Sequence, residues 1–133
     1  MKSPYNIFLR QPELLILGYG ELNRQEGTGV FAISSLFARF VEFRQHDNTN
    51  PDRSTFYKSG ARLVSVGYIT PELKPTDIDN PFGHPPNYYE ETDKGMRVLR
   101  AHVWVLPEMD IELEHVFVFP DIIEAVEKLA AGS

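Results

Sequence analysis

Cationic and hydroxyl-bearing side chains are concentrated in the segment 50–69, NPDRSTFYKSGARLVSVGYI. Arginine and lysine pair with phosphate groups, and side-chain hydroxyls hydrogen-bond to phosphates or base edges. Phe56, Leu63 and Val66 recur at helical spacing, which places the polar groups mostly on the other faces of a helix. We therefore expect a helix over 51–66 that contacts duplex DNA through Arg53, Ser54, Thr55, Tyr57, Lys58 and Arg62.

The side chains of this expected helix differ in reach. Residues near its N-terminal end can touch base edges, whereas Lys58 and Arg62 are better placed for phosphates. Tyr57 has two interpretations, a hydroxyl donated to a phosphate or a ring that simply packs. The alternative for the whole set is a solvated helix face with ordinary surface cations.

Both ends of this helix carry the residues that usually start and stop one. Asn50 offers a side-chain oxygen to the first N–H groups, and Pro51 has the φ of a first helical position. Gly67 can adopt the left-handed conformation that terminates a helix. Tyr68 and Ile69 then predict the start of a strand.

A proline-rich loop is expected next. The segment 70–86 holds five prolines, so we expect it not to pair continuously. Lys74 and His84 are its only cations; Lys74 is a further candidate for phosphate contact, with an ordinary loop residue as the alternative. The segment 87–91 predicts a second short strand, and Thr92 is a good N-cap for a following helix.

Other segments have apolar residues at helical spacing. These predicted helices cover 11–23, 30–43, 93–106 (closed by Pro107) and 121–131. Between the last two, the segment 108–119 is ambiguous: its β-branched and aromatic HVFVF favours an extended segment or short strand, and a helix broken at Pro120 is the alternative.

Length and composition point to a folded chain of one-domain size. The chain has 133 residues, of which 42% are hydrophobic. No apolar run is long enough to span a bilayer, and the N-terminus lacks the pattern of a secretory signal. The absence of cysteine excludes disulfides, cysteine-ligated zinc and thiol catalysis, and it fits a reducing compartment. We expect a cytoplasmic protein with no membrane partner.

Charge is unevenly distributed along the chain. The net charge is −6, which opposes nucleic-acid binding at long range. Residues 1–69 carry eight Lys or Arg against six Asp or Glu, whereas residues 70–133 carry five against thirteen. Any nucleic-acid surface is therefore expected in the first half.

No pattern predicts catalysis, a metal or a cofactor. The four histidines lie in different predicted elements without ligand spacing. Adjacent carboxylates such as Glu90 with Glu91 more often mark a solvated edge than acid–base catalysis. The glycines form neither a dinucleotide-binding nor a Walker pattern. We expect a protein that is not an enzyme.

Three blocks, PELLILGYGEL, STFYKSGARLVSVGYI and YYEETDKGMRVL, occur in an order and spacing that resemble the PadR-like winged helix-turn-helix transcriptional regulators, with MarR-like regulators as the near neighbour. The resemblance covers about residues 11–105. It implies a mainly α fold with a small β wing, a winged helix-turn-helix domain over 11–106 and a C-terminal extension over 107–133 as a candidate dimerisation segment. It further implies a homodimeric regulator of transcription that binds double-stranded DNA.

The chain departs from the family pattern at two informative places. Gly60 stands where the family has an aliphatic core residue, so Phe37 or Phe40 is expected to fill that space. The wing is acidic at Asp77 and Asp79, where DNA-binding wings usually carry arginine or lysine. The alternative function is thus a winged-helix interaction module that contacts a basic protein partner through its acidic wing and tail, without binding DNA.

Overall fold

The computed structural model describes residues 9–43, 53–72 and 88–132, without the side chains of Phe43 and Arg53. Helices dominate, and two short antiparallel strands accompany them, which confirms the expected class at that level. In chain order the elements are α1 (Gln11–Gln25), α2 (Ile33–Phe43), α3 (Arg53–Ser65), β1 (Ile69–Glu72), β2 (Tyr88–Glu91), α5 (Asp93–Glu108), α6 (Leu113–Phe117) and α7 (Pro120–Ala131).

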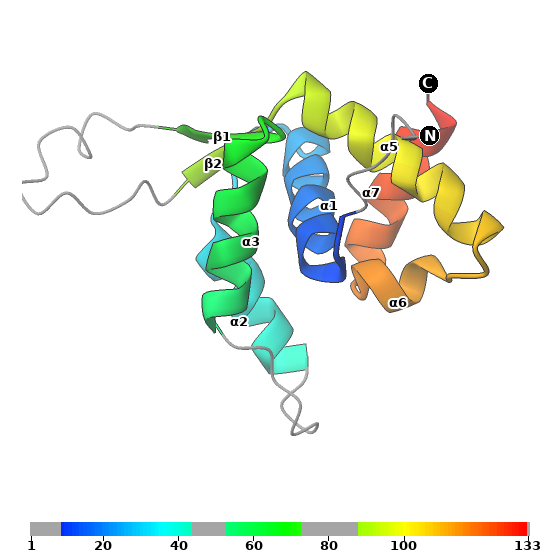
Figure 1. Ribbon diagram of the computed structural model, residues 1–133, viewed down its shortest axis with the longest axis horizontal. Helices are drawn as coiled ribbons and strands as arrows, with labels where there is room; N and C mark the ends of the chain where they lie inside the picture. The colour runs from blue at the N-terminus through cyan, green and yellow to red at the C-terminus, as the bar shows by residue number, and fades with distance from the viewer. Residues whose placement is uncertain (1–8, 44–52, 73–87, 133) are drawn as a thin grey trace, which may run out of the picture.

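Helix α1 lies at the centre of the structure (Figure 1). It contacts α2 and α3 on one side, α5, α6 and α7 on the other, and β2 near its end. Because it is surrounded, Leu15, Ile16 and Leu17 are all buried and its apolar positions cover most of its circumference. None of the described helices combines the length and apolar character needed to cross a membrane.

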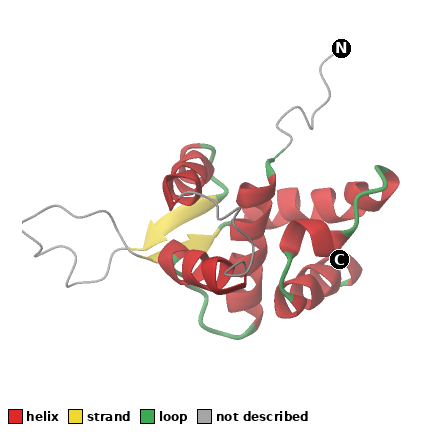
Figure 2. Ribbon diagram, turned by 90° about the horizontal axis from the view of Figure 1, so that it is seen from below, coloured by secondary structure: helices red, strands yellow, loops and turns green. Residues whose placement is uncertain are grey.

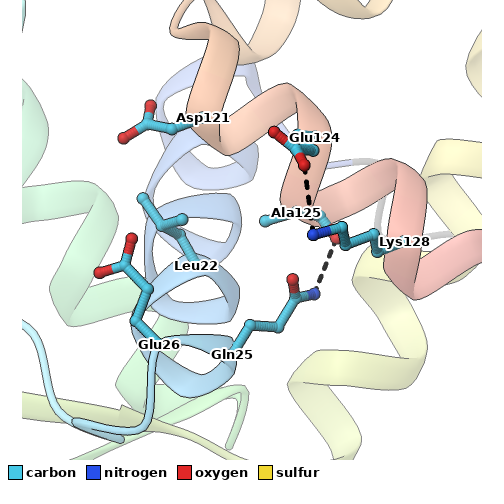
Figure 3. A pocket seen from close by; sticks show the side chains of 7 residues that line it. All are labelled: Leu22, Gln25, Glu26, Asp121, Glu124, Ala125 and Lys128. Atoms are coloured by element: carbon cyan, nitrogen blue, oxygen red, sulfur yellow. Dashed lines mark hydrogen bonds and ion pairs between the residues drawn. The ribbon is translucent and has the colours of Figure 1, made fainter.

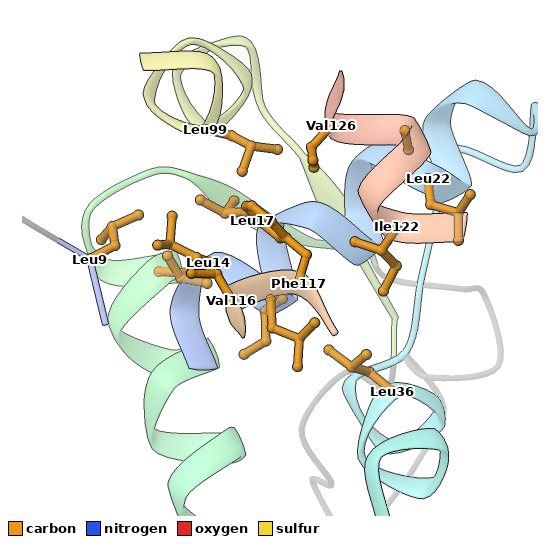
Figure 4. Packing of buried hydrophobic residues seen from close by; sticks show 14 of the residues in the cluster. Leu9, Leu14, Leu17, Leu22, Leu36, Leu99, Val116, Phe117, Ile122 and Val126 are labelled. Atoms are coloured by element: carbon orange, nitrogen blue, oxygen red, sulfur yellow. The ribbon is translucent and has the colours of Figure 1, made fainter. Parts of the chain in front are cut away.

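The glycines of α1 allow close packing. A Cβ at Gly18 would lie 2.8 Å from Ile122 Cγ2 and 2.9 Å from Phe117 Cδ1. At Gly20 it would lie 2.9 Å from the Phe31 ring. Phe117 and Ile122 thus pack directly against the α1 backbone, as part of the buried cluster drawn in Figure 4. The helix-propensity cost of these glycines is offset by this contact.

The small sheet is completed by an isolated bridge. β1 and β2 pair antiparallel with Ile69 opposite Glu91 (Figure 2). On the other edge of β2, Phe31 and Tyr89 exchange two backbone hydrogen bonds of 2.9 and 2.8 Å. Residues 30–32 are therefore not helical, contrary to the expectation of a helix from 30, because the backbone of Phe31 pairs with β2.

The end of α3 and the start of α5 confirm the sequence interpretation. Gly67 has φ of +83°, its N–H bonds Val64 O, and Tyr68 N–H bonds Leu63 O, which is the Schellman arrangement. Thr92 Oγ1 accepts from Gly95 N at 3.0 Å as the N-cap of α5. The starting residues Asn50 and Pro51 lie outside the described ranges.

Two boundaries differ from the expected ones. The strand pairing extends over 69–72, so the first residues of the predicted loop belong to β1. Pro107 lies inside the last turn of α5, which ends at Glu108, and Asp110 beyond the helix has φ of +60°. The remainder of the predicted loop, 73–87, is outside the described residues.

The extended segment favoured for 110–119 was wrong, and the alternative, a helix that stops before Pro120, is closer to the structure. Residues 113–117 form the short helix α6, which turns Val116 and Phe117 into the core. Val118 then has φ of +62° and ψ of −50°, and Phe119 N–H donates to Phe117 O at 2.6 Å. This is a γ-turn of the strained, positive-φ kind, and it redirects the chain into α7.

The hydrophobic core is continuous across the expected domain boundary after residue 106. Buried side chains from α6 and α7 belong to the same cluster as those of α1 and α5. The split into 11–106 and 107–133 stays a prediction, as does the use of the second part in dimerisation.

The space over Gly60 is filled by a residue other than those expected. A Cβ there would lie 2.3 Å from Ile33 Cδ1. Phe37 and Phe40 instead pack on Phe56, with ring centroids 5.5 Å apart in each case. Ile33, at the first turn of α2, is therefore the side chain that occupies the space over Gly60.

Two helical glycines give contrasting predictions. A Cβ at Gly95 would lie 2.1 Å from Tyr68 O, a backbone atom that cannot move without disturbing β1. We expect Gly95→Ala to lower the free energy of unfolding by about 2 kcal/mol. In Gly60→Ala the added Cβ contacts only the end of a side chain, and alanine has the higher helix propensity. The free energy of unfolding should therefore fall by less than half as much as in Gly95→Ala. Urea unfolding of both variants measures the difference, and equal losses would contradict it.

Candidate functional site

The exposed face of α3 is the candidate site. Phe56 and Leu63 are buried, and at about 100° per residue the opposite stripe runs through Ser54, Lys58, Ala61 and Ser65. Ser54, Thr55 and Lys58 are exposed, as the sequence led us to expect. The contact of Phe56 with α2 fixes which face of α3 points outward.

Arg62 is held on the flank of α3 that faces α1. Its Nε lies 3.3 Å from Glu13 Oε2, and the Glu13 side chain is only 1% exposed. The other oxygen, Glu13 Oε1, accepts from Arg10 N at 2.8 Å. Because Arg62 compensates a buried carboxylate, part of its charge is already used. The Arg62 side chain as a whole remains 44% exposed.

Tyr57 lies on the other flank, beside the small sheet. Its side chain is 41% exposed, so it is not packed into the core. Burial, and then the neighbouring Tyr57, raises the pKa of Tyr89 on β2.

Other predicted contacts are not placed. The side chain of Arg53, the whole of Lys74 and the acidic loop positions Asp77 and Asp79 lie outside the described parts of the chain. Their expected roles remain predictions.

Lys94 joins this region although the sequence analysis did not select it. It comes from the first turn of α5, yet its Nζ donates to Val66 O at 3.0 Å and lies 5.4 Å from the Tyr68 ring centroid. A cation from the acidic half thus sits at the C-terminal end of α3. The available signal was its position two residues after the Thr92 N-cap, in the first turn of the helix that follows the second strand.

A small hollow lies between α1 and α7, away from α3. It has a volume of about 220 Å³ and is bordered by Glu26, Asp121 and Glu124 together with Lys128 (Figure 3). Lys128 Nζ is 3.2 Å from Glu124 Oε1, so its charge is partly neutralised. Asp121 is likewise paired with Arg39, whose Nη2 lies 2.9 Å from Asp121 Oδ1, so Glu26 is the one lining carboxylate without an ion pair among the described residues.

A pair of buried carboxyl groups connects α1 to β2. Glu91 is 7% exposed, and no N–H group of the described residues reaches its carboxyl oxygens. Burial, then Glu21, raises the pKa of Glu91 to about 10. Burial also opposes ionisation of Glu21, but hydrogen bonds from Arg24, Glu91 and Gln25 outweigh it and lower the pKa of Glu21. A raised pKa for Glu91 beside a lowered pKa for Glu21 is the pattern expected when two neighbouring carboxyl groups share one proton.

Within the described ranges no three His, Asp or Glu side chains converge on a point that could hold a metal ion. His102 is occupied structurally: Leu9 N donates to its Nε2 at 3.2 Å and its Nδ1 lies 2.9 Å from Val98 O. His115 is exposed on α6 beside Glu112.

Comparison with known proteins gave no relative. No protein-family model matches the chain, and neither the curated proteins nor the solved structures include a significant match.

Proposed function

We propose that this chain is a homodimeric DNA-binding transcriptional regulator of the winged helix-turn-helix type, resembling the PadR-like regulators, with α3 as its recognition helix. The order of the elements supports the fold assignment: α1, a bridge at Phe31, α2, α3 and then the two strands. In a winged helix a short strand between the first two helices pairs with the wing, and the Phe31–Tyr89 bridge has that place.

The observation that carries the functional proposal is the outward face of α3. Its apolar side is fixed on α2 and α1, so a side chain such as Lys58 cannot turn inward without unpacking Phe56 or Leu63. A rigid helix with short hydroxyls and a cation facing solvent is suited to the major groove. Tyr57 and Lys94 extend this polar surface toward the sheet and the C-terminal end of α3.

Lys58→Ala provides the direct test, because Lys58 is exposed and lies on the face of α3 opposite the core. We expect it to weaken duplex binding about tenfold at low salt and to reduce the slope of log affinity against log salt by about 1 per protomer. Fluorescence anisotropy with random and genomic duplexes, repeated over a salt series, measures both quantities.

The matched control is Lys128→Ala, which removes the same charge from α7 and should leave DNA affinity nearly unchanged. Arg62 is unsuitable for this test, because its removal would leave Glu13 buried without its cationic partner. No binding of any duplex at low salt, or equal affinity of both lysine variants, would refute the DNA proposal.

The dimer is proposed from the same resemblance. Two copies of α3 would then read half-sites about one helical turn apart, and the stoichiometry of the complex would be two chains per palindromic site. Sedimentation of the free and DNA-bound protein measures this directly.

One observation favours the second candidate function, an interaction module for a basic protein. Glu26, Asp121 and Glu124 border the hollow between α1 and α7, and although Asp121 pairs with Arg39 and Glu124 with Lys128, Glu26 leaves a negative charge there. Failure of the DNA assay, together with salt-sensitive binding of a lysine-rich peptide, would replace the first proposal with this one.

A further inference from the structure

The middle of the outward face of α3 is lined by small side chains. Phe56 and Leu63 are buried and mark the inner side of the helix. At about 100° per residue, the direction opposite to them passes close to Ser54, Ala61 and Ser65, which are all exposed. Because none of these three side chains is longer than a hydroxymethyl group, the backbone of α3 can approach a bound molecule closely along this line.

Longer polar side chains lie on the two flanks of this line. Lys58 and Arg62 lie on one flank and Tyr57 lies on the other, at about 30° to 70° from the outward direction. In the major groove, the flanks of a helix face the phosphate backbones and its middle faces the base edges. The sequence of α3 contains no Asp or Glu, so none of its own side chains would repel a phosphate. This division leaves the three small side chains for the bases.

Ala61 differs in chemistry from the two serines beside it. Ser65 Oγ already donates to Arg62 O at 2.7 Å, and a serine hydroxyl can pair with a donor or an acceptor, so it discriminates poorly among bases. Ala61 offers only a methyl group. The one apolar group that a base pair presents in the major groove is the C5-methyl of thymine. Opposite any other base, the Ala61 methyl would cover a polar edge without pairing it.

We propose that Ala61 is a specificity-determining residue of α3 and contacts the methyl group of one thymine in each half-site of the bound DNA. This inference rests on the function proposed above, since it requires α3 to lie in the major groove. Lys58 and Ala61 are separated by about 4.5 Å along the helix axis. With Lys58 on a phosphate, Ala61 therefore lies over base pairs next to that phosphate, where a methyl contact adds sequence preference to a contact that has none.

The test compares thymine with deoxyuridine, which lacks only the methyl group. The probe is a duplex selected by the full chain from a random-sequence library, with deoxyuridine placed at each invariant thymine in turn. At one position of each half-site we expect the deoxyuridine duplex to bind at least fourfold more weakly, as burial of one methyl group predicts. Ala61→Gly should bind both duplexes equally, because the contact is already lost. Fluorescence anisotropy at one fixed salt concentration measures all four affinities.

Two further variants separate this contact from effects on folding. Ala131→Gly makes the same change at an exposed position of α7 and should keep the full preference for thymine. Ala61→Leu retains high helix propensity but is too long for a close approach to the bases, so it should weaken binding of both duplexes at least tenfold. Circular dichroism shows whether each variant is folded.

Several results would overturn the proposal while leaving DNA binding by α3 intact. These are a selected site without an invariant thymine, equal affinity for thymine and deoxyuridine at every position, and undiminished binding by Ala61→Leu. A full preference for thymine in Ala61→Gly would also overturn it, because the methyl group would then act through another residue or through DNA shape. Binding of no duplex by the parent chain at low salt would refute the proposed function itself, and this inference with it.

Discussion

Phe117→Ala is expected to lower the free energy of unfolding by about 4 kcal/mol, because it empties the space between α6 and the α1 backbone. Phe117 is completely buried, and its ring lies where a side chain at Gly18 would be. No flexible side chain stands at position 18 of α1 to collapse into the cavity, since glycine has none. Chemical denaturation monitored by circular dichroism measures the change.

His115→Ala is the matched control, since it alters the same short helix at a side chain that is 75% exposed. It should change the free energy of unfolding by less than about 0.5 kcal/mol. If Phe117→Ala lowered the free energy of unfolding as little as His115→Ala, α6 would not be part of the cooperatively folded core. That result would favour the expected domain boundary after residue 106. A large loss would mean that α6 and the preceding helices unfold together.

Glu91→Gln is expected to stabilise the protein at neutral and alkaline pH. Burial, then Glu21, raises the pKa of Glu91 to about 10 from the ordinary 4.5. Between these values the native state keeps a proton that the unfolded chain has lost, so the free energy of unfolding falls as the pH rises. At pH 7 the raised pKa lowers the free energy of unfolding by on the order of 3 kcal/mol. Glutamine does not ionise, so Glu91→Gln removes this loss.

The partner of Glu91 titrates in the opposite sense. The lowered pKa of Glu21 adds stability above its ordinary value of 4.5, and this contribution is lost as the pH falls through the folded value. The glutamine amide at position 91 can still donate to ionised Glu21, so the variant should retain that contribution. The gain from Glu91→Gln should therefore be small near pH 4.5 and should grow steadily toward pH 9.

Glu90→Gln, on the exposed neighbour of the same strand, is the control and should leave the pH dependence unchanged. Thermal unfolding of the parent and both variants over a pH series gives the comparison. A constant difference between parent and Glu91→Gln at every pH would show that Glu91 does not carry the proton assigned to it.

Local signals predicted the elements whose ends depend on nearby residues. Gly67 stops α3 and Thr92 starts α5 because each acts on backbone groups within a turn of itself. The α7 pattern was equally clear, since Ile122, Val126 and Leu129 share one apolar face. In each case the information needed lies within a few residues.

The conformation of 113–119 could not be predicted in this way. The β-branched and aromatic residues of HVFVF favour a strand, but none of the described strands pairs with them. Burial of Val116, and of Phe117 against Gly18 of α1, outweighs that preference. The same applies to Phe31, whose backbone pairs with the distant Tyr89, and to Ile33, which fills the space over Gly60.

For the candidate site, the sequence by itself determined which polar side chains of α3 face outward. Helical spacing leaves them no other face once Phe56 and Leu63 are buried. Only the tertiary structure decided how much charge they offer. Arg62 is paired with Glu13 from α1, whereas Lys94 arrives beside α3 from the acidic half. Helical faces follow from local periodicity, but charge pairing depends on which distant segments the shared core brings together.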